Sequence, residues 1–314
     1  TPSSTGRLHA KQSDHSTVFF LLIFVGSAAA VSIPAASTTI RSLAFDTQGR
    51  LWIATFGEGL WLRDNSGLRR FREENSDRPF PMINNLLVYD RYLYVATAGG
   101  GCLRLNTDSF RFDPLKQTPG FEKLHALYAS ASGTVYIGSV GSGTAVLAND
   151  EWKPVKANES INLTWVNSIL EWQNQIWLGT ATGLYKTSAN GLWKPESAEL
   201  PRAINCLLLH DNVLYVGTTD RGVYIIHPGK YPEPVTGTIG QINFLVNYSD
   251  GVVAGGDLGI WVVGDKNTRD ITSGIEYPKC ACSNGKNILH IGTTDGKIFM
   301  TEDLQKFELI FSIN

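Results

Sequence analysis

The chain has 314 residues, of which 43% are apolar and 18% charged, and its 27 basic side chains nearly balance its 29 acidic ones. This content is enough for a large buried core and excludes a disordered chain, and the near-neutral balance does not favour a nucleic-acid partner. Gly is abundant at 31 residues, beside 8 Trp, 11 Tyr and 14 Phe. This mixture is typical of β-structure, in which aromatic side chains pack on pleated faces and glycines form turns.

The first 39 residues differ from the rest. Residues 1–16 are polar and carry Arg7 and Lys11, and residues 18–33 read VFFLLIFVGSAAAVSI. A cleaved export signal and a retained membrane helix over residues 17–33 both fit this pattern, and we favour the helix, since the apolar run reaches the length needed to span a bilayer. Either way, the basic residues predict that residues 1–16 are cytoplasmic and that the remainder is extracytoplasmic. Residues 34–39 (PAASTT) form a short predicted linker.

The stretch LWIATFGEGLWL, residues 51–62, returns six more times with variation. A small residue marks the same point in each copy: Ala54, Ala96, Gly138, Gly179, Gly217, Gly255 and Gly292. The spacings are 42, 42, 41, 38, 38 and 37 residues. A period near 40 indicates a repeat architecture, which has to be recognised before any single residue is interpreted.

One period contains four short β-rich segments. In the first copy they are residues 40–46 (IRSLAFD), 50–55 (RLWIAT), 57–64 (GEGLWLRD) and 68–73 (LRRFRE), with a turn at 47–49. Four strands in about 40 residues are typical of a propeller blade, and no helical period follows residue 40. We therefore predict an all-β, seven-bladed β-propeller over residues 40–314, with four antiparallel strands per blade, after one N-terminal transmembrane or signal helix.

Most repeated residues are expected to serve packing. The aromatic residue two places before the small residue, as in Trp52, should fill the space between blades. The small residue should allow neighbouring sheets to approach closely. The hydroxyl that follows, as in Thr55, should bind backbone groups of the next turn.

One position in the first strand of each unit is the best candidate for a binding role. Its residues are Arg41, Asn84, His125, Asn167, Asn205, Asn243 and Cys280. First strands line the channel of a propeller, so these side chains could form a polar ring that suits a sugar, a peptide end or ordered water. Alternatively, the repeated Asn only guides the chain into the strand through local hydrogen bonds. Arg41 and His125 break the pattern and are the better candidates for selective contacts.

No catalytic, cofactor or metal site is predicted. The histidines of the repeats occupy different places in their units, so no metal-ligand spacing such as H-x-x-x-H occurs. Cys280 and Cys282 in C-A-C share one face of a strand, a poor geometry for a disulfide and an incomplete zinc site.

The repeat resembles the two-component regulator propeller family, found in extracytoplasmic sensor portions of bacterial signalling proteins. Residues 40–60 (IRSLAFDTQGRLWIATFGEGL) carry the resemblance, and residues 166–184 (VNSILEWQNQIWLGTATGL) nearly as well. In such sensors the propeller is followed by an immunoglobulin-like module, a membrane helix and a kinase. None of these patterns occurs in the 314 residues, so we expect the chain to act without an output module of its own.

Three function classes follow. The first is a non-catalytic, membrane-anchored scaffold that binds the subunits of a larger membrane complex through a rigid propeller face. The second is a sensor or receptor that binds a small ligand in the axial channel. The third is an enzyme resembling the streptogramin lyases, which are also seven-bladed and use a histidine and a metal. Fold alone does not separate them, and we expect the scaffold.

Overall fold

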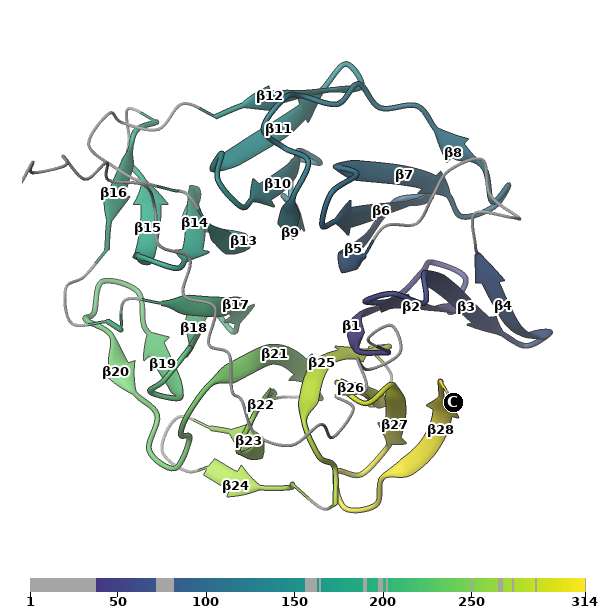
Figure 1. Ribbon diagram of the computed structural model, residues 1–314. Helices are drawn as coiled ribbons and strands as arrows, with labels where there is room; N and C mark the ends of the chain where they lie inside the picture. The colour runs from purple at the N-terminus through teal and green to yellow at the C-terminus, as the bar shows by residue number, and fades with distance from the viewer. Residues whose placement is uncertain are drawn as a thin grey trace, which may run out of the picture. The chain divides into compact units, whose positions relative to one another are not determined.

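The computed structural model describes residues 38–71, 82–155, 163, 165–188, 191–196, 200–201, 203–249, 251–264, 268–272, 274–285 and 287–313. These residues form seven four-stranded antiparallel sheets, each made of consecutive strands. The sheets are arranged around a central axis, with the first strand of each innermost and the fourth outermost (Figure 1). The predicted seven-bladed propeller is therefore confirmed.

The strand bounds follow the repeat. Blade 1 consists of β1 (Ile40–Phe45), β2 (Leu51–Thr55), β3 (Leu60–Asp64) and β4 (Gly67–Phe71). Blade 2 consists of β5 (Ile83–Tyr89), β6 (Tyr92–Thr97), β7 (Cys102–Asn106) and β8 (Phe112–Asp113). Blade 3 consists of β9 (Leu124–Ala129), β10 (Val135–Ser139), β11 (Thr144–Ala148) and β12 (Glu151–Pro154). Blade 4 consists of β13 (Val166–Trp172), β14 (Gln175–Thr180), β15 (Gly183–Thr187) and β16 (Trp193–Pro195).

The remaining three blades repeat the arrangement. Blade 5 consists of β17 (Ile204–His210), β18 (Val213–Thr218), β19 (Val223–Ile226) and β20 (Glu233–Pro234). Blade 6 consists of β21 (Ile242–Tyr248), β22 (Gly251–Gly256), β23 (Gly259–Val263) and β24 (Thr268–Asp270). Blade 7 consists of β25 (Pro278–Ser283), β26 (Leu289–Thr293), β27 (Lys297–Thr301) and β28 (Glu308–Ser312).

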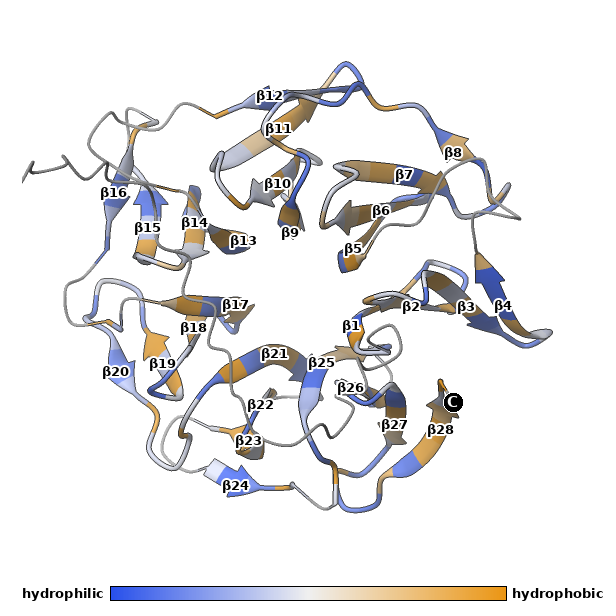
Figure 2. Ribbon diagram, in the orientation of Figure 1, coloured by the Kyte–Doolittle hydropathy of each residue, from blue (hydrophilic) through white to orange (hydrophobic). Residues whose placement is uncertain are grey.

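The second strand of each blade is the core of the fold. All five residues of β2 and of β26 are buried, whereas the outer strand β4 exposes three of its five. Figure 2 shows the same gradient, with more hydrophilic residues on the outer strands β16 and β24. Trp52 is fully buried and packs with Leu86 and Leu93 of the next blade, so the repeated aromatic position fills the space between blades as predicted.

The small residue and the hydroxyl also have their predicted roles. A Cβ on Gly179 would lie 2.8 Å from Ile204 Cγ2 of the next blade, so only a small residue permits this approach. Thr55 Oγ1 donates to the Gly59 carbonyl at 2.8 Å and accepts from the Glu58 N–H at 3.0 Å. These two bonds hold the turn between β2 and β3.

Among the residues that the structure describes, the ring closes between blades 7 and 1 without an exchanged strand. All four strands of blade 7 come from residues 278–312, and its inner edge packs on β1. Ile40, Leu43 and Ile53 form one buried cluster with Cys280 and Ile298. Closure therefore depends on side-chain packing between blades, as the sequence of the last repeat indicates.

The predictions for the tail 1–16, the anchor or signal helix 17–33 and most of the linker 34–39 lie outside the described residues. Within the described part of the chain, no helix is both long and apolar enough to cross a membrane.

Candidate functional site

Each first strand begins with a β-bulge, and in blades 1 to 6 the bulge falls at the predicted binding position. In blade 1, Ile40 pairs with Thr55 and Ser42 with Ala54, so Arg41 is left over between them. The same shift leaves Asn84 unpaired between Ile83 and Asn85. A bulge re-aims the side chain of its extra residue, because that residue does not follow the alternation of the strand. The bulge is what presents this position to the channel.

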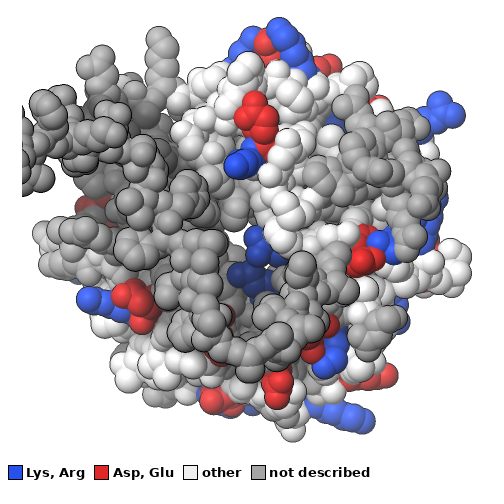
Figure 3. Space-filling model, in the orientation of Figure 1, with Lys and Arg blue, Asp and Glu red and all other residues white. Residues whose placement is uncertain are grey.

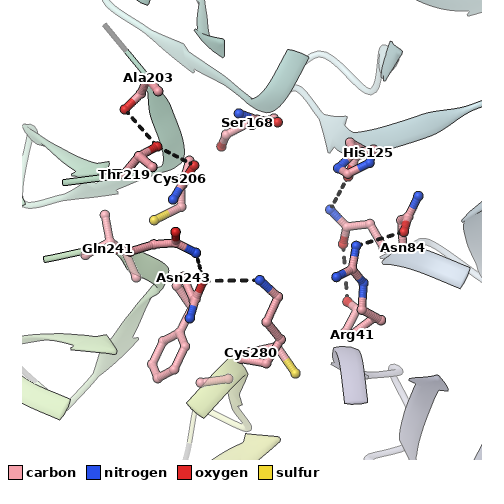
Figure 4. A pocket seen from close by; sticks show the side chains of 18 of the residues that line it. Arg41, Asn84, His125, Ser168, Ala203, Cys206, Thr219, Gln241, Asn243 and Cys280 are labelled. Atoms are coloured by element: carbon pink, nitrogen blue, oxygen red, sulfur yellow. Dashed lines mark hydrogen bonds between the residues drawn. The ribbon is translucent and has the colours of Figure 1, made fainter. Parts of the chain in front are cut away.

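The bulge residues line one cavity on the axis of the ring. Its volume is about 590 Å³, which is the size of a small-molecule site. Figure 4 shows Arg41 and Asn84 facing Asn243 across this space, with His125 beside Asn84. Six of the seven predicted residues are bulge residues that line the cavity, so the structure brings them together: Arg41, Asn84, His125, Asn167, Asn205 and Asn243.

The seventh member of the ring is Lys279, and the assignment of Cys280 to this place is wrong. In blade 7, Pro278 pairs with Thr293 and Cys280 with Gly292, so the bulge falls on Lys279. Cys280 belongs to the next ring of residues, together with Ser42. The error arises because the bulge of blade 7 precedes the small residue by 13 residues, from Lys279 to Gly292, whereas in blades 2, 4, 5 and 6 the distance is 12, as from Asn84 to Ala96.

The asparagines of the ring bind neighbouring blades, and two of them also bond a turn of their own blade: Asn243 Nδ2 donates to Asp257 Oδ1 at 2.8 Å, and Asn205 Oδ1 accepts from Thr219 Oγ1 at 3.1 Å. Each donates its side-chain N–H to the carbonyl of the first anchor residue in the next blade. The bonds run from Asn84 to Leu124 at 2.8 Å, Asn167 to Ile204 at 2.9 Å, Asn205 to Ile242 at 3.0 Å and Asn243 to Pro278 at 3.0 Å. These four bonds join neighbouring blades and are not the local hydrogen bonds of the alternative interpretation, and the amide oxygens are directed at other partners.

Two cations contact these amide oxygens. Arg41 Nη2 donates to Asn84 Oδ1 at 3.0 Å, and Lys279 Nζ donates to Asn243 Oδ1 at 3.1 Å. Burial lowers the pKa of Lys279, and the nearby Arg41 lowers it further, against the opposing influence of Cys280 and Asp257. Burial also lowers the pKa of Arg41. Blades 7 and 1 thus place two partly desolvated positive charges side by side on one wall of the cavity.

His125 contributes an uncharged ring at neutral pH. Burial lowers its pKa to about 4, and the positive charges of Arg41 and Lys279 contribute to the shift. Its ring meets the indole of Trp165 edge to face, with the centroids 5.8 Å apart. Trp165 is 45% exposed and also lines the cavity, so blades 3 and 4 give the opposite wall an aromatic surface.

The cysteines are not nucleophiles at neutral pH. Cys206 and Cys280 line the cavity, and burial raises the pKa of each thiol to about 12. All four cysteines are free thiols. Among the described residues, no group of three His, Cys, Asp or Glu side chains is arranged to hold a metal ion.

Several contributors to the cavity were not identified from the sequence. Asn85 Nδ2 donates to the His125 carbonyl at 3.1 Å, and Ser168 Oγ accepts from the Leu207 N–H at 3.1 Å. Both lie one residue beyond the bulge, in the ring of Ser42 and Cys280. Lys279 could have been found by counting back 13 residues from Gly292, the distance that separates Arg41 from Ala54.

The first repeat matches a known family. Residues 35–57 match the family model described as "Two component regulator propeller". A comparison with curated proteins found no match.

Three solved structures of similar fold illustrate the likeness. The extracellular domain of a hybrid two component system from B. thetaiotaomicron is 19% identical, with a TM-score of 0.69 over 85% of this chain and 38% of that one. PorZ, a surface component of the type-IX secretion system of Porphyromonas gingivalis, is 15% identical, with a TM-score of 0.66 over 88% of this chain and 38% of that one. Virginiamycin B lyase from Staphylococcus aureus is 10% identical, with a TM-score of 0.71 over 83% of this chain and 94% of that one.

At these identities the likeness shows the fold alone. The chain spans well under half the length of the sensor and PorZ structures that it matches. Residues 40–60 resemble the two-component regulator propeller repeat, and this resemblance is confirmed by the family match and by the seven-bladed ring. The chain carries the two-component regulator propeller repeat on a seven-bladed β-propeller.

Proposed function

We propose that the chain is a non-catalytic binding module of the extracytoplasmic sensor type, and that its axial cavity receives a small ligand. The observation that carries this proposal is the convergence of the seven bulge residues on one cavity of about 590 Å³. The blades repeat one another in their packing residues but differ at this ring. Such variation gives the wall a pattern of charge and hydrogen bonding that a symmetric scaffold does not need.

The chemistry of the wall favours binding over catalysis. The cavity thiols are protonated at neutral pH because burial raises their pKa values to about 12. The His125 ring is packed against Trp165, and each asparagine of the ring donates one hydrogen bond to a backbone carbonyl of the next blade. A nucleophile paired with a base is the usual basis of hydrolytic or lyase chemistry, and these groups do not supply one.

A cavity-filling variant tests the proposal. Ala181 and Ala203 line the cavity without side-chain hydrogen bonds of their own, so Ala181→Trp with Ala203→Trp should occupy the space and keep the ring bonds. Wild type and variant are incubated with an extract of small molecules, washed, denatured and analysed by mass spectrometry. We expect a compound that wild type retains and the filled variant does not. A control with Asn65→Trp in the exposed β3–β4 turn should retain it.

The same compounds retained by both folded proteins, or none retained by either, would contradict the axial site. Circular dichroism and the thermal midpoint establish that the variant is folded.

The membrane scaffold remains a second proposal, and one observation favours it. Exposed apolar side chains lie in loops at the end of the ring where the bulges open: Leu258 is 60% exposed, Tyr277 61% and Trp165 45%. Backbone bonds tie these loops together in each blade, as from Ala181 N–H to Trp165 O at 3.1 Å and from Thr294 N–H to Tyr277 O at 3.1 Å. Exposed apolar groups that share one end of a rigid ring suit a protein contact.

In that proposal the N-terminal segment anchors the propeller on the extracytoplasmic side of a membrane, and the partners are subunits of a membrane complex. The resemblance in fold to PorZ, described as a surface component of a secretion system, supports the idea by analogy. Purification from gently solubilised membranes should yield a stoichiometric partner that the Leu258→Asp and Tyr277→Ala variant loses. A partner retained by this variant would exclude the apolar loops as the contact.

A further inference from the structure

The two cations of the ring lack the counter-charge that partly buried cations normally have. The described residues form nine ion pairs, and neither Arg41 nor Lys279 belongs to any of them. Arg41 Nε is buried without a hydrogen-bond partner. Their hydrogen-bond acceptors are neutral amide oxygens, and the Arg41 guanidinium also lies over the Phe56 ring at 5.3 Å. These contacts orient the two side chains but bring no negative charge to them. Bringing like charges together out of water costs free energy unless an anion compensates.

The nearest carboxylate does not fill this role. Asp257 raises the pKa of Lys279, but its Oδ1 accepts a hydrogen bond from Asn243 Nδ2 at 2.8 Å and its side chain is exposed in the β22–β23 turn. Figure 3 shows basic side chains inside the central hollow of the ring, with acidic side chains on the surrounding surface. The interior of the cavity therefore presents positive charge to a molecule that enters from this face.

The opposite wall has a different character. Trp165 exposes part of its indole to the cavity, and Asn167 Oδ1 accepts no hydrogen bond from the described residues. An indole face stacks on the apolar face of a sugar or other ring, and an amide oxygen accepts from a hydroxyl. A ligand that matches both walls has an anionic group at one end and a hydroxylated ring at the other.

We propose that the axial cavity binds an organic oxyanion, with its carboxylate or phosphate group between Arg41 and Lys279 and its remaining part against Trp165. The assignment rests on the proposed binding function and gives it a ligand class, of which acidic sugars and sugar phosphates are members. Arg41 supplies the guanidinium N–H groups that Asn84 does not use, and Lys279 supplies the N–H groups not used by Asn243. Charge-assisted hydrogen bonds of this kind are stronger than those between neutral groups.

Three probes that share a ring test the charge requirement: glucuronate, glucose 6-phosphate and glucose. Titration calorimetry at low salt and pH near 7 should show that one or both anions bind at least about tenfold more tightly than glucose. The preference between glucuronate and glucose 6-phosphate distinguishes carboxylate from phosphate. Raising the salt concentration to about 0.5 M should weaken the binding of the anions more than that of glucose.

Two charge-removing variants locate the anion. Lys279→Gln and Arg41→Gln each retain a donor for the asparagine oxygen, so the ring bonds and the thermal midpoint should be preserved. Each should weaken anion binding about tenfold or more and leave glucose binding unchanged. Lys279→Arg should restore most of the loss, and Lys230→Gln in an exposed loop should have no effect.

Equal affinities for glucose and both anions, or anion binding unaffected by Lys279→Gln and Arg41→Gln, would overturn the oxyanion assignment. Failure of both anions to bind at concentrations of about 50 mM, far above ordinary metabolite affinities, would overturn it too. The cavity-filling experiment tests the binding function independently of the ligand class. An uncharged compound retained only by wild type would support the binding function and contradict the oxyanion assignment.

Discussion

Ile40 of the first blade lies so close to Gly292 of the last that a Cβ built on the glycine would be 2.5 Å from Ile40 Cγ2. Ile40 is fully buried, and Cys280 Sγ would be 2.8 Å from the same Cβ. The contact joins residues 252 positions apart and forms the centre of the seam that closes the ring. It is the same contact that Gly179 makes with Ile204 between blades 4 and 5.

Gly292→Ala is therefore expected to destabilise the ring at its seam. Overpacking a filled core costs about 1–3 kcal/mol, because side chains and backbone must shift to make room. Chemical denaturation followed by Trp fluorescence measures the loss. Gly99→Ala, in a turn where a Cβ would meet nothing within 4 Å, is the matched control and should change little. Equal stabilities of the two variants would show that the seam can relax.

The inter-blade amides are expected to hold the inner ring together. Asn84→Leu keeps the size of the side chain but leaves the Leu124 carbonyl without its donor and Arg41 without its acceptor. Losing partners of buried polar groups costs about 1–3 kcal/mol for each group left unsatisfied. Urea denaturation should show this loss, and Asn65→Leu in an exposed turn should not. An unchanged midpoint for Asn84→Leu would mean that water replaces the amide without cost.

The stability of the ring is expected to fall as the pH drops from about 6.5 to about 4. Burial, and then the charge of Arg63, lower the pKa of His290 from 6.5 to about 4. The folded state favours the neutral imidazole of His290. The contribution of this residue to the free energy of unfolding is therefore fully present above pH 6.5 and is lost progressively as the pH falls toward 4. Asp64 lines the same pocket, and hydrogen bonds from Ser66 lower its pKa, so it stays largely ionised over this pH range.

Thermal unfolding between pH 7 and pH 4 measures this effect, which for His290 amounts to at most about 3 kcal/mol. Other blades carry an aromatic residue at the same place, as Trp177 in blade 4, so His290→Tyr should fit. The variant should lose less stability at pH 4 than wild type. Its stability should still depend on pH to some extent, because burial also lowers the pKa of His125 to about 4. An identical pH profile for His290→Tyr and wild type would exclude the seam histidine as a cause.

The free thiols are expected to be inert in the folded protein. With a pKa of about 12, Cys206 and Cys280 hold about a thousandth of the thiolate that an ordinary cysteine holds at pH 8. An aromatic disulfide reagent should therefore react slowly until denaturant exposes all four cysteines. Ser66→Cys in an exposed turn provides a fast-reacting control. Fast reaction of a native thiol would show that the cavity opens readily.

The sequence predicted the blade well because each blade is built from short-range rules. Trp52, Ala54 and Thr55 lie within four residues of one another. The type of each residue indicates the contact that it makes with the next blade or turn. The site was predicted less completely, since its geometry depends on pairing between strands. Pro278 replaces the usual Ile or Val before the bulge, so the sequence pattern at this strand does not mark Lys279, whereas the pairing of Pro278 with Thr293 places the bulge on it.

The role of the asparagines was harder to predict because their hydrogen bonds connect residues that are far apart in the sequence. A repeated Asn at the start of a strand has the same pattern whether it bonds its own turn or a carbonyl about 40 residues away. The bond from Asn167 to Ile204 spans 37 residues and appears only when the blades are placed side by side.

Each blade is made of one continuous stretch of the chain, so the blades can fold in the order of the sequence and the ring closes last. Every sheet is complete once its own repeat has emerged from the ribosome, so blades can form one after another with short loops to close. Only the contact of blade 1 with blade 7 must wait for the whole chain. A circular permutant joined at the seam and opened between blades 4 and 5 should therefore fold to the same ring, with its last step moved to the new opening.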